Sequence, residues 1–139
     1  MKVFVDTNVV LDVLLERHPF SEDSFMVFQL ANLKRIKGYL SAASITDIFY
    51  FVRKKWRDFE EVYQKMNKLT QLFSVVSVSE TTIANALALR WKDFEDAIQY
   101  MAAAECGVDC IVTRNAADYK MPVVPCMSPV DFIAYFNAR

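Results

Sequence analysis

The chain has 139 residues, of which 54% are hydrophobic and 24% charged, with a formal net charge of −1. This length suits one domain with a core of ordinary size, so we expect a single domain over residues 1–139. Only two glycines and one histidine occur, which excludes the glycine-rich loops that bind dinucleotides or phosphates and any metal site of several histidines.

Cysteine usage and hydropathy indicate the compartment. Cys106, Cys110 and Cys126 are an odd number in a chain with a substantial core, which predicts buried free thiols and no disulfide framework. Asp6 interrupts any apolar segment typical of a signal peptide. No apolar run reaches the roughly 18 residues of a membrane-spanning helix. We therefore expect a cytoplasmic protein without a membrane segment.

Short apolar strands alternate with helical patterns from the first residues onward. The first half predicts strands at 3–5 and 39–41, and helices at 9–17, 21–38, 44–56 and 58–72. Ser44 and Asp47 match an S-x-x-D variant of the capping box, which favours a helix start at this point.

The second half continues the same alternation. It predicts strands at 73–78, 110–112 and 123–124, and helices at 80–90 and 93–106. Ser128 caps a last helix, with Pro129 in its favoured first position. This order predicts an α/β fold, a three-layer sandwich with a mainly parallel central sheet.

Oxygen-bearing side chains recur where the predicted strands end or the following helices begin. Ligands of open parallel sheets bind beyond the carboxyl ends of the strands, so we expect these side chains to converge there. They are Asp6, Asp47, Asp96, Asn115 and Asp118. Such a cluster would raise some carboxyl pKa values by mutual repulsion, and a divalent cation would remove this cost. Mg²⁺ and Mn²⁺ prefer oxygen ligands.

Three of the four acids also have a simpler interpretation. Asp47 and Asp96 stand where an acid stabilises a helix N-terminus. Asp118 suits a turn. Asp6 has no such reason, because an acid directly after a short apolar strand follows no propensity. The convergence of all four acids therefore carries the metal hypothesis.

Two basic clusters flank this acidic set in the sequence: Lys34, Arg35 and Lys37, and then Arg53, Lys54, Lys55 and Arg57 around Trp56. A basic flank beside an acidic centre suits a polyanion held next to a metal site. A solvated helix surface is the other interpretation of each cluster.

Four segments, V-D-T-N-V, S-I-T-D, D-F-E-D-A and I-V-T-R-N-A-A-D-Y, resemble the PIN-domain nucleases, especially the bacterial branch with VapC-type toxins. They lie in order over essentially the whole chain, at 5–9, 44–47, 93–97 and 111–119. The resemblance implies a parallel-sheet α/β sandwich and an Mg²⁺- or Mn²⁺-dependent ribonuclease that cuts RNA. It makes Asp6, Asp47 and Asp96 metal-binding carboxylates, and it implies an antitoxin protein as partner and a homodimer.

Two positions depart from the family pattern. Many members have glutamate in place of Asp47, so the shorter side chain must lie nearer the metal or reach it through water. Many also have aspartate in place of Asn115, which keeps a carbonyl oxygen but adds no charge. Asp118 would then supply the fourth carboxylate. One-metal and two-metal mechanisms both stay open.

The resemblance implies phosphodiester hydrolysis without histidine. We expect Asp6, Asp96 and either Asn115 or Asp118 to hold the ion, with Asp47 on a ligand water or a second ion. Orienting groups and substrate contacts complete the expected site. Thr7, Asn8 and Thr113 are candidates to orient the carboxylates, and Arg114 to contact substrate phosphate or pair with a carboxylate. Trp56, Trp91 and Tyr119 are available to stack RNA bases.

Three other functions compete with this hypothesis. A PIN-like domain with a weakened site would act as a binding scaffold, which the departures at Asp47 and Asn115 support. A haloacid-dehalogenase-like phosphatase would need a second aspartate two positions after Asp6, where the chain has Asn8. A phospho-receiver domain would need an aspartate and lysine pair at strand ends that no residue here supplies.

Overall fold

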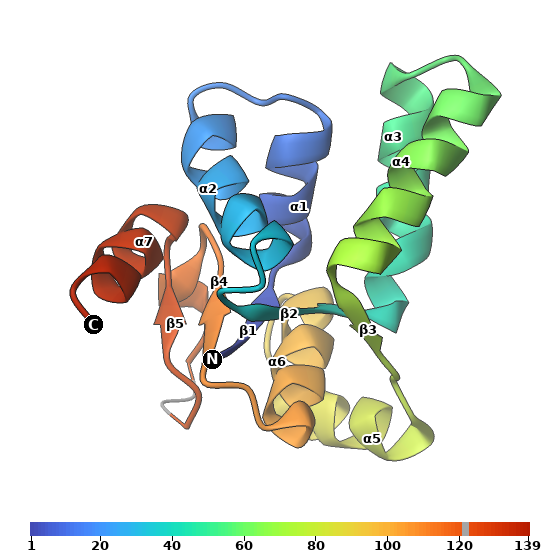
Figure 1. The fold of residues 1–139 in the computed structure, drawn as a ribbon. Helices are drawn as coiled ribbons and strands as arrows, with labels where there is room; N and C mark the ends of the chain where they lie inside the picture. The colour runs from blue at the N-terminus through green and yellow to red at the C-terminus, as the bar shows by residue number, and fades with distance from the viewer. Residues whose placement is uncertain (121–122) are drawn as a thin grey trace.

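Five parallel strands form the central sheet of the computed structural model, which describes residues 1–120 and 123–139 (Figure 1). Its strands are β1 (Lys2–Val5), β2 (Lys37–Ser41), β3 (Ser74–Val76), β4 (Cys110–Val112) and β5 (Cys126–Met127). They lie in the order β3-β2-β1-β4-β5, and every pairing is parallel. The carboxyl ends of β1, β2 and β4 therefore meet at one edge of the sheet.

Helices cover both faces of this sheet. They are α1 (Thr7–Leu14), α2 (Phe20–Asn32), α3 (Ile45–Lys55), α4 (Phe59–Leu72), α5 (Glu80–Leu89), α6 (Phe94–Cys106) and α7 (Pro129–Asn137). Figure 1 shows α1, α2 and α7 on one face, α5 and α6 on the other, and the α3–α4 hairpin standing to the side of α1. The predicted three-layer α/β sandwich with a mainly parallel sheet is confirmed.

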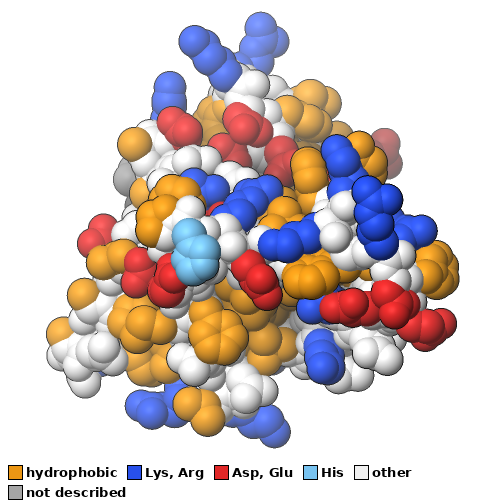
Figure 2. Space-filling view, turned by 90° about the horizontal axis from the view of Figure 1, so that it is seen from above, with side chains coloured by type: hydrophobic (Ala, Val, Ile, Leu, Met, Phe, Trp, Pro, Cys, Tyr) orange, Lys and Arg blue, Asp and Glu red, His pale blue; other side chains and the backbone are white. Residues whose placement is uncertain are grey.

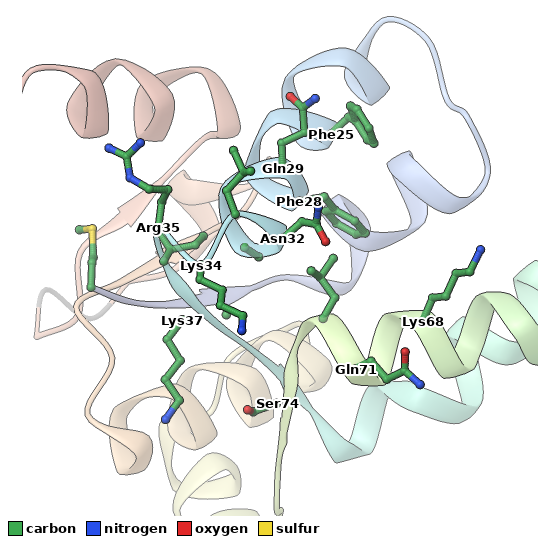
Figure 3. Close-up of a pocket in the computed structure, with 16 residues that line it drawn as sticks. Phe25, Phe28, Gln29, Asn32, Lys34, Arg35, Lys37, Lys68, Gln71 and Ser74 are labelled. Carbon is green, nitrogen blue, oxygen red and sulfur yellow. The ribbon is translucent and has the colours of Figure 1, made fainter.

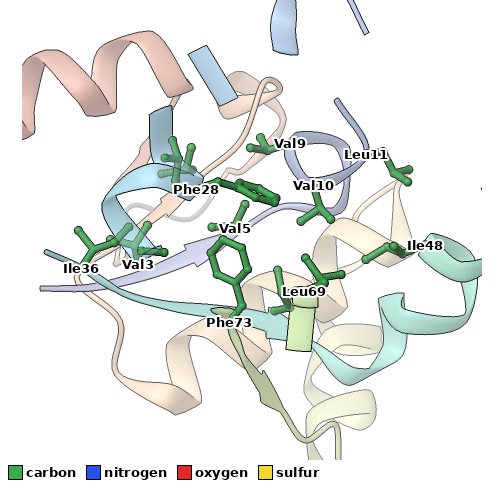
Figure 4. Packing of buried hydrophobic residues seen from close by; sticks show 14 of the residues in the cluster. Val3, Val5, Val9, Val10, Leu11, Phe28, Ile36, Ile48, Leu69 and Phe73 are labelled. Carbon is green, nitrogen blue, oxygen red and sulfur yellow. The ribbon is translucent and has the colours of Figure 1, made fainter. Parts of the chain in front are cut away.

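Alternating residues of β1 supply two separate cores. Val3 and Val5 pack with α1, α2 and α4, and Figure 4 shows them beside Phe28 and Phe73. Phe4 lies on the opposite face, where it packs against α6. A central strand with apolar side chains on both faces is what a parallel sheet between two helical layers requires. This burial holds Asp6, the next residue, at a fixed place at the end of β1.

The last strand lies farther along the chain than predicted. Residues 123–124 are not a strand, and β5 is Cys126–Met127, which pairs with Ile111 and Val112. The edge position beside β4 is set by hydrogen bonds from Ile111 N to Pro125 O and from Thr113 N to Met127 O. Val124 is buried in the second core, so its apolar character reflects side-chain burial.

Two predicted helices end earlier than the sequence pattern indicates. The helix expected over 21–38 ends at Asn32, and a turn with Lys34 in the left-handed region (φ 57°) leads into β2. The helix expected to reach residue 17 ends at Leu14. In both cases apolar and basic residues extend the helical pattern into a turn.

The capping box predicted at Ser44 does not form. Ser44 has helical backbone angles and makes no side-chain cap bond, because a 3₁₀ turn, η1 (Ala42–Ser44), precedes α3. Ser41 caps this turn instead, accepting a hydrogen bond from Ala43 N at 3.1 Å. Ser128 caps α7 as predicted, and Ser79 caps α5.

The three cysteines are free thiols, with Cys110 buried and Cys106 and Cys126 half-buried. Burial raises the pKa of Cys110 to about 12, so this thiol stays protonated at neutral pH. No helix within residues 1–120 and 123–139 combines the length and apolarity needed to cross a membrane.

Candidate active site

Asp6 lies at the end of β1, where its carboxylate is 1% exposed. It is also the N-cap of α1, and it accepts a hydrogen bond from Asn8 N at 3.4 Å. That bond is long for a cap, so it engages the carboxylate weakly. The capping role therefore does not account for a charged group buried this deeply.

Two buried side chains hold the Asp6 carboxylate in one orientation. Gln99 Nε2 donates to Asp6 Oδ1 at 2.9 Å, and Thr113 Oγ1 donates to Oδ2 at 2.6 Å. Gln99 Oε1 in turn accepts from Thr7 N and Thr7 Oγ1, both at 3.1 Å. Thr113 and Thr7 thus lie where the sequence predicted orienting groups, whereas Gln99 was missed. Its place one turn after Asp96 on α6 was the available signal.

Asp96 belongs to the first turn of α6 and is 5% exposed. Tyr119 Oη lies 3.4 Å from Asp96 Oδ1 and 3.4 Å from Gln99 Nε2, so a chain of polar contacts joins Asp96 to Asp6. Burial, together with the charges of Asp6 and other nearby acids, raises the pKa of Asp96 to about 7. This carboxyl group consequently needs a positive charge nearby to be fully ionised at neutral pH.

Glu95 belongs to the same site, although it is not among the ligands predicted from the sequence. Its carboxyl group loses water, and the negative charges of Asp6, Asp47 and Asp93 act on it, which together raise its pKa. The signal for Glu95 was its place in the acidic run before Asp96. Asp93 caps α6 by accepting a hydrogen bond from Asp96 N at 3.1 Å.

Asp47 lies exposed in the first turn of α3. Its charge helps to raise the pKa of Glu95, so the start of α3 lies within electrostatic range of the start of α6. None of Asp6, Asp47, Glu95 and Asp96 forms an ion pair with a described residue. The site is therefore a set of acids whose charges no basic side chain within the described ranges offsets.

Asn115 and Asp118 follow β4 as the sequence predicted. Asn115 N donates to Thr113 Oγ1 at 3.0 Å, which ties this loop to the hydroxyl that holds Asp6. Asp118 is exposed in η2 (Ala116–Asp118), and its charge is not among those that raise the pKa of Asp96 or Glu95. Of the two candidates for the fourth ligand, Asn115 is the one linked to the acids.

Arg114 forms an ion pair with Asp12, one of the two roles foreseen for it. Its Nε lies 2.7 Å from Asp12 Oδ2 and its Nη2 3.2 Å from Oδ1, and the guanidinium stacks 4.0 Å above the ring centre of Phe20. Asp12 is fully buried, and burial raises the pKa of its carboxyl group despite this partner. The pair joins the end of β4 to α1.

The expected stacking aromatics are mostly enclosed. Tyr119 is 7% exposed and Trp91 is half-buried against Tyr100 and Tyr119. Trp56 is also half-buried, and its indole N–H donates to Leu14 O at 3.1 Å. Exposed aromatic side chains close to the site in the sequence are Phe94, the residue before Glu95 on α6, and Tyr50 and Phe51 on α3.

A large cavity lies away from the acids. It has a volume of about 940 Å³ and opens between the C-terminal ends of α2 and α4 and the start of β2 (Figure 3). Figure 3 shows Lys34, Lys37 and Lys68 around it, and its lining residues within 1–120 and 123–139 include no carboxylate. Since β2 starts here, this groove lies at the amino ends of the strands, opposite the acidic site.

The acidic site fits a divalent cation by its donors and charge. Among residues 1–120 and 123–139, no three His, Cys, Asp or Glu side chains stand close enough together to form a ready metal cage. Mg²⁺ does not need one, because it keeps several waters and usually takes one or two carboxylates. Asp6 and Asp96 supply two, and a cation would offset both the burial and the neighbouring negative charges that raise the pKa of Asp96.

A comparison with protein families identifies the domain that carries these residues. The model of the PIN domain matches residues 2–117, which include Asp6, Asp47, Asp96 and Asn115. The chain belongs to the PIN-domain family. Asp118 falls one residue beyond the matched segment.

Individual PIN proteins are similar along nearly the whole chain. Ribonuclease VapC1 of Aquifex aeolicus is 23% identical over 98% of this chain and 96% of its own length. VapBC2 of Rickettsia felis, bound to a DNA fragment of its promoter, superposes with a TM-score of 0.69 at 17% identity, over 91% of this chain and 97% of that one. VapC20 of Mycobacterium tuberculosis, a toxin that cleaves the sarcin-ricin loop, gives 0.65 at 15% identity, over 88% and 99%. These structures share the PIN fold found here.

Proposed function

We propose that this PIN-domain protein is a divalent-metal-dependent endoribonuclease that hydrolyses RNA phosphodiester bonds. The observation that carries the proposal is the pair of buried carboxylates, Asp6 from the end of β1 and Asp96 from α6, joined through Gln99 and Tyr119. Similarity to the ribonuclease VapC1 supports RNA as the substrate class.

Mg²⁺ or Mn²⁺ held by Asp6 and Asp96 would supply an acidic water as nucleophile and charge stabilisation for the attacked phosphate. Asp6 presents its carboxylate in one direction because Gln99 and Thr113 each hold one oxygen. Asp47 and Glu95 are exposed, and the charges of both Asp47 and Asp6 act on Glu95, so these two acids would hold a ligand water or a second ion. Asn115 offers a carbonyl oxygen from the loop that Thr113 fixes.

Replacement of the two buried carboxylates tests this function. We expect Asp6→Asn and Asp96→Asn each to lower Mn²⁺-dependent cleavage of single-stranded RNA by at least about 100-fold, since each removes a metal-binding charge. Asp131→Asn, an exposed acid in the first turn of α7, is the matched control. Mn²⁺ affinity measured by calorimetry should fall in the two site variants only. Unchanged metal-dependent cleavage in both would remove the assignment.

A weakened site that binds RNA without cutting it is the second candidate. Asn115 in place of a family aspartate and the lack of a ready three-ligand cage among the described residues favour it. A Mn²⁺ titration separates the two candidates. Tight RNA binding without cleavage at any Mn²⁺ concentration would establish the scaffold and exclude the nuclease.

We also propose that the protein is the toxin of a toxin–antitoxin pair and forms a homodimer. The VapBC2 structure of Rickettsia felis and a toxin–antitoxin complex of Klebsiella pneumoniae (TM-score 0.68) share its fold and support a small antitoxin as partner. Co-expression with the product of a neighbouring short gene should give a complex in which RNA cleavage is blocked. Light scattering should give twice the 16.0 kDa mass of one chain.

A further inference from the structure

One exposed face of α3 starts at the acidic site. Asp47 stands in its first turn, and Tyr50, Phe51 and Lys54 follow at intervals of three, four and seven residues, which places them on the same face of the helix. All are exposed, Tyr50 to 56% and Phe51 to 39%. We call Tyr50, Phe51 and Lys54 the α3 stripe.

The stripe ends at a concentration of positive charge. Arg53, Lys54 and Arg57 line an open hollow of about 410 Å³ at the turn between α3 and α4. None of the three forms an ion pair with any residue of the described ranges. We call these three residues the basic hollow. Figure 2 shows one group of Lys and Arg side chains at the right of the view, above a row of acidic side chains, and further Lys and Arg side chains elsewhere on this face.

The aromatic side chains of the stripe lie against cations and one another. Lys54 Nζ lies 5.3 Å from the ring centre of Tyr50, whose ring is 5.4 Å from that of Phe51 in an edge-on arrangement. Arg53 stands 5.6 Å above the ring of Phe59, and its Nη1 donates to Arg57 O at 2.8 Å. Exposed rings beside unpaired cations are what proteins use to bind single-stranded nucleic acid.

A strand of RNA fits this face better than a protein segment does. Three unpaired cations complement a polyanion, and a peptide would need carboxylates in the same arrangement. Exposed rings of Tyr and Phe give bases of any kind a stacking surface. The stripe is also continuous with Asp47, so a strand lying on it leads directly to the acids.

We propose that the α3 stripe and the basic hollow bind the part of a single-stranded RNA that flanks the scissile phosphate. A base stacks on Tyr50 and Phe51, and a backbone phosphate lies in the basic hollow. Asp47 and Lys54 are seven residues apart, roughly 10 Å along the helix, so the hollow contacts the RNA beyond the reacting phosphate. The proposal rests on the ribonuclease function above and assigns the surface that holds its substrate.

The test uses two double variants, Lys54→Gln with Arg57→Gln and Tyr50→Ala with Phe51→Ala. The matched control, Lys34→Gln with Lys37→Gln, removes the same charge at the groove opposite the acidic site (Figure 3). Fluorescence anisotropy measures the Kd for a labelled single-stranded RNA of about 12 nucleotides over a range of KCl concentrations, with Asp96→Asn added throughout to prevent cleavage. Cleavage by the versions that keep Asp96 gives kcat and KM.

Each double variant has its own expected signature. The charge variant should reduce the slope of log Kd against log[KCl] by about 0.7, the contribution of one phosphate contact on a single strand, because the basic hollow holds one phosphate. The aromatic variant should weaken binding by roughly 5- to 150-fold with little change in slope. Both should raise KM and leave kcat within about twofold, because the acids are untouched. The charge-conserving substitution Lys54→Arg should bind the RNA as tightly as the unaltered chain does.

Binding and cleavage like those of the control would overturn the proposal while leaving the nuclease intact. If RNA binding and cleavage match the control but a purified antitoxin binds the variants more weakly, the face belongs to the antitoxin. If the unaltered chain neither binds nor cleaves RNA, the ribonuclease function is refuted, and this proposal is refuted with it.

Discussion

Thr113 Oγ1 donates a hydrogen bond of 2.6 Å to Asp6 Oδ2, joining the ends of two neighbouring parallel strands through their side chains. The same hydroxyl accepts a hydrogen bond from Asn115 N at 3.0 Å, so one threonine sets both the carboxylate and the following loop. The bond is buried, since Thr113 and Asp6 are 0% and 1% exposed. A single hydroxyl thus connects the central strand β1 with the loop after β4.

Thr113→Val removes this hydroxyl at nearly constant shape. We expect kcat of RNA cleavage and Mn²⁺ affinity to fall by about 10- to 100-fold, because a carboxylate without its orienting partner presents its oxygens less well. Thr81→Val, on the exposed side of α5, is the control and should behave as the unaltered chain does. Thr113→Ser should recover most of the affinity. Equal Mn²⁺ affinity in Thr113→Val would show that the hydroxyl does not orient Asp6.

Gln99→Leu should destabilise the fold as well as the site. The substitution removes the buried partner of Thr7 N and of Asp6 Oδ1, at a cost of about 1–3 kcal/mol for each group left unsatisfied. Urea unfolding followed by circular dichroism measures the loss. Gln64→Leu on the exposed side of α4 is the matched control. A midpoint equal to that of this control would argue against the buried network.

Stability without metal should fall as pH rises, because Asp96 has a raised pKa. Its pKa goes from 3.8 in the unfolded chain to about 7 in the fold, so between these values the folded state binds more protons. The favourable contribution of the neutral group is complete below 3.8 and is lost as pH rises through about 7. Glu95 and Asp12, whose pKa values are also raised, act in the same direction.

Thermal unfolding in EDTA across this pH range measures the effect. Asp96→Asn should flatten the decline by removing its main titrating group, and Asp131→Asn should not. Mn²⁺ should stabilise the unaltered chain most at the upper end of the range, because it binds the ionised form. A decline of equal steepness in Asp96→Asn would contradict the assigned shift.

The fold should tolerate the loss of both Arg114 and Asp12 better than the loss of Arg114 alone. Arg114→Met leaves the fully buried Asp12 with Arg17 as its remaining cation, whose Nη1 lies 3.7 Å from Asp12 Oδ1. We expect a loss of about 3 kcal/mol in the free energy of unfolding, since removing the closer, hydrogen-bonded partner of a buried charge is costly. The double variant Asp12→Leu with Arg114→Met should recover part of this loss. A double variant as unstable as the sum of the single ones would show that the two side chains act independently.

The sequence by itself determined the first four strands, the alternating helices and the position of Asp6, because these follow from local patterns of apolar residues, whereas it misplaced β5. β1 reads as an apolar run that ends in an acid, and the structure places that acid at the carboxyl edge of a parallel sheet. The four motifs also indicated the PIN family, which the match over residues 2–117 confirms.

Only the tertiary structure decided which polar groups meet. Glu95 and Gln99 join the site because α6 packs beside β1, a relation between residues more than 80 positions apart. Asp118 is near in sequence to Asn115, yet the η2 turn leaves it exposed. Periodicity sets the face on which a side chain lies, whereas contacts across the sheet depend on strand order and register, which no local pattern encodes.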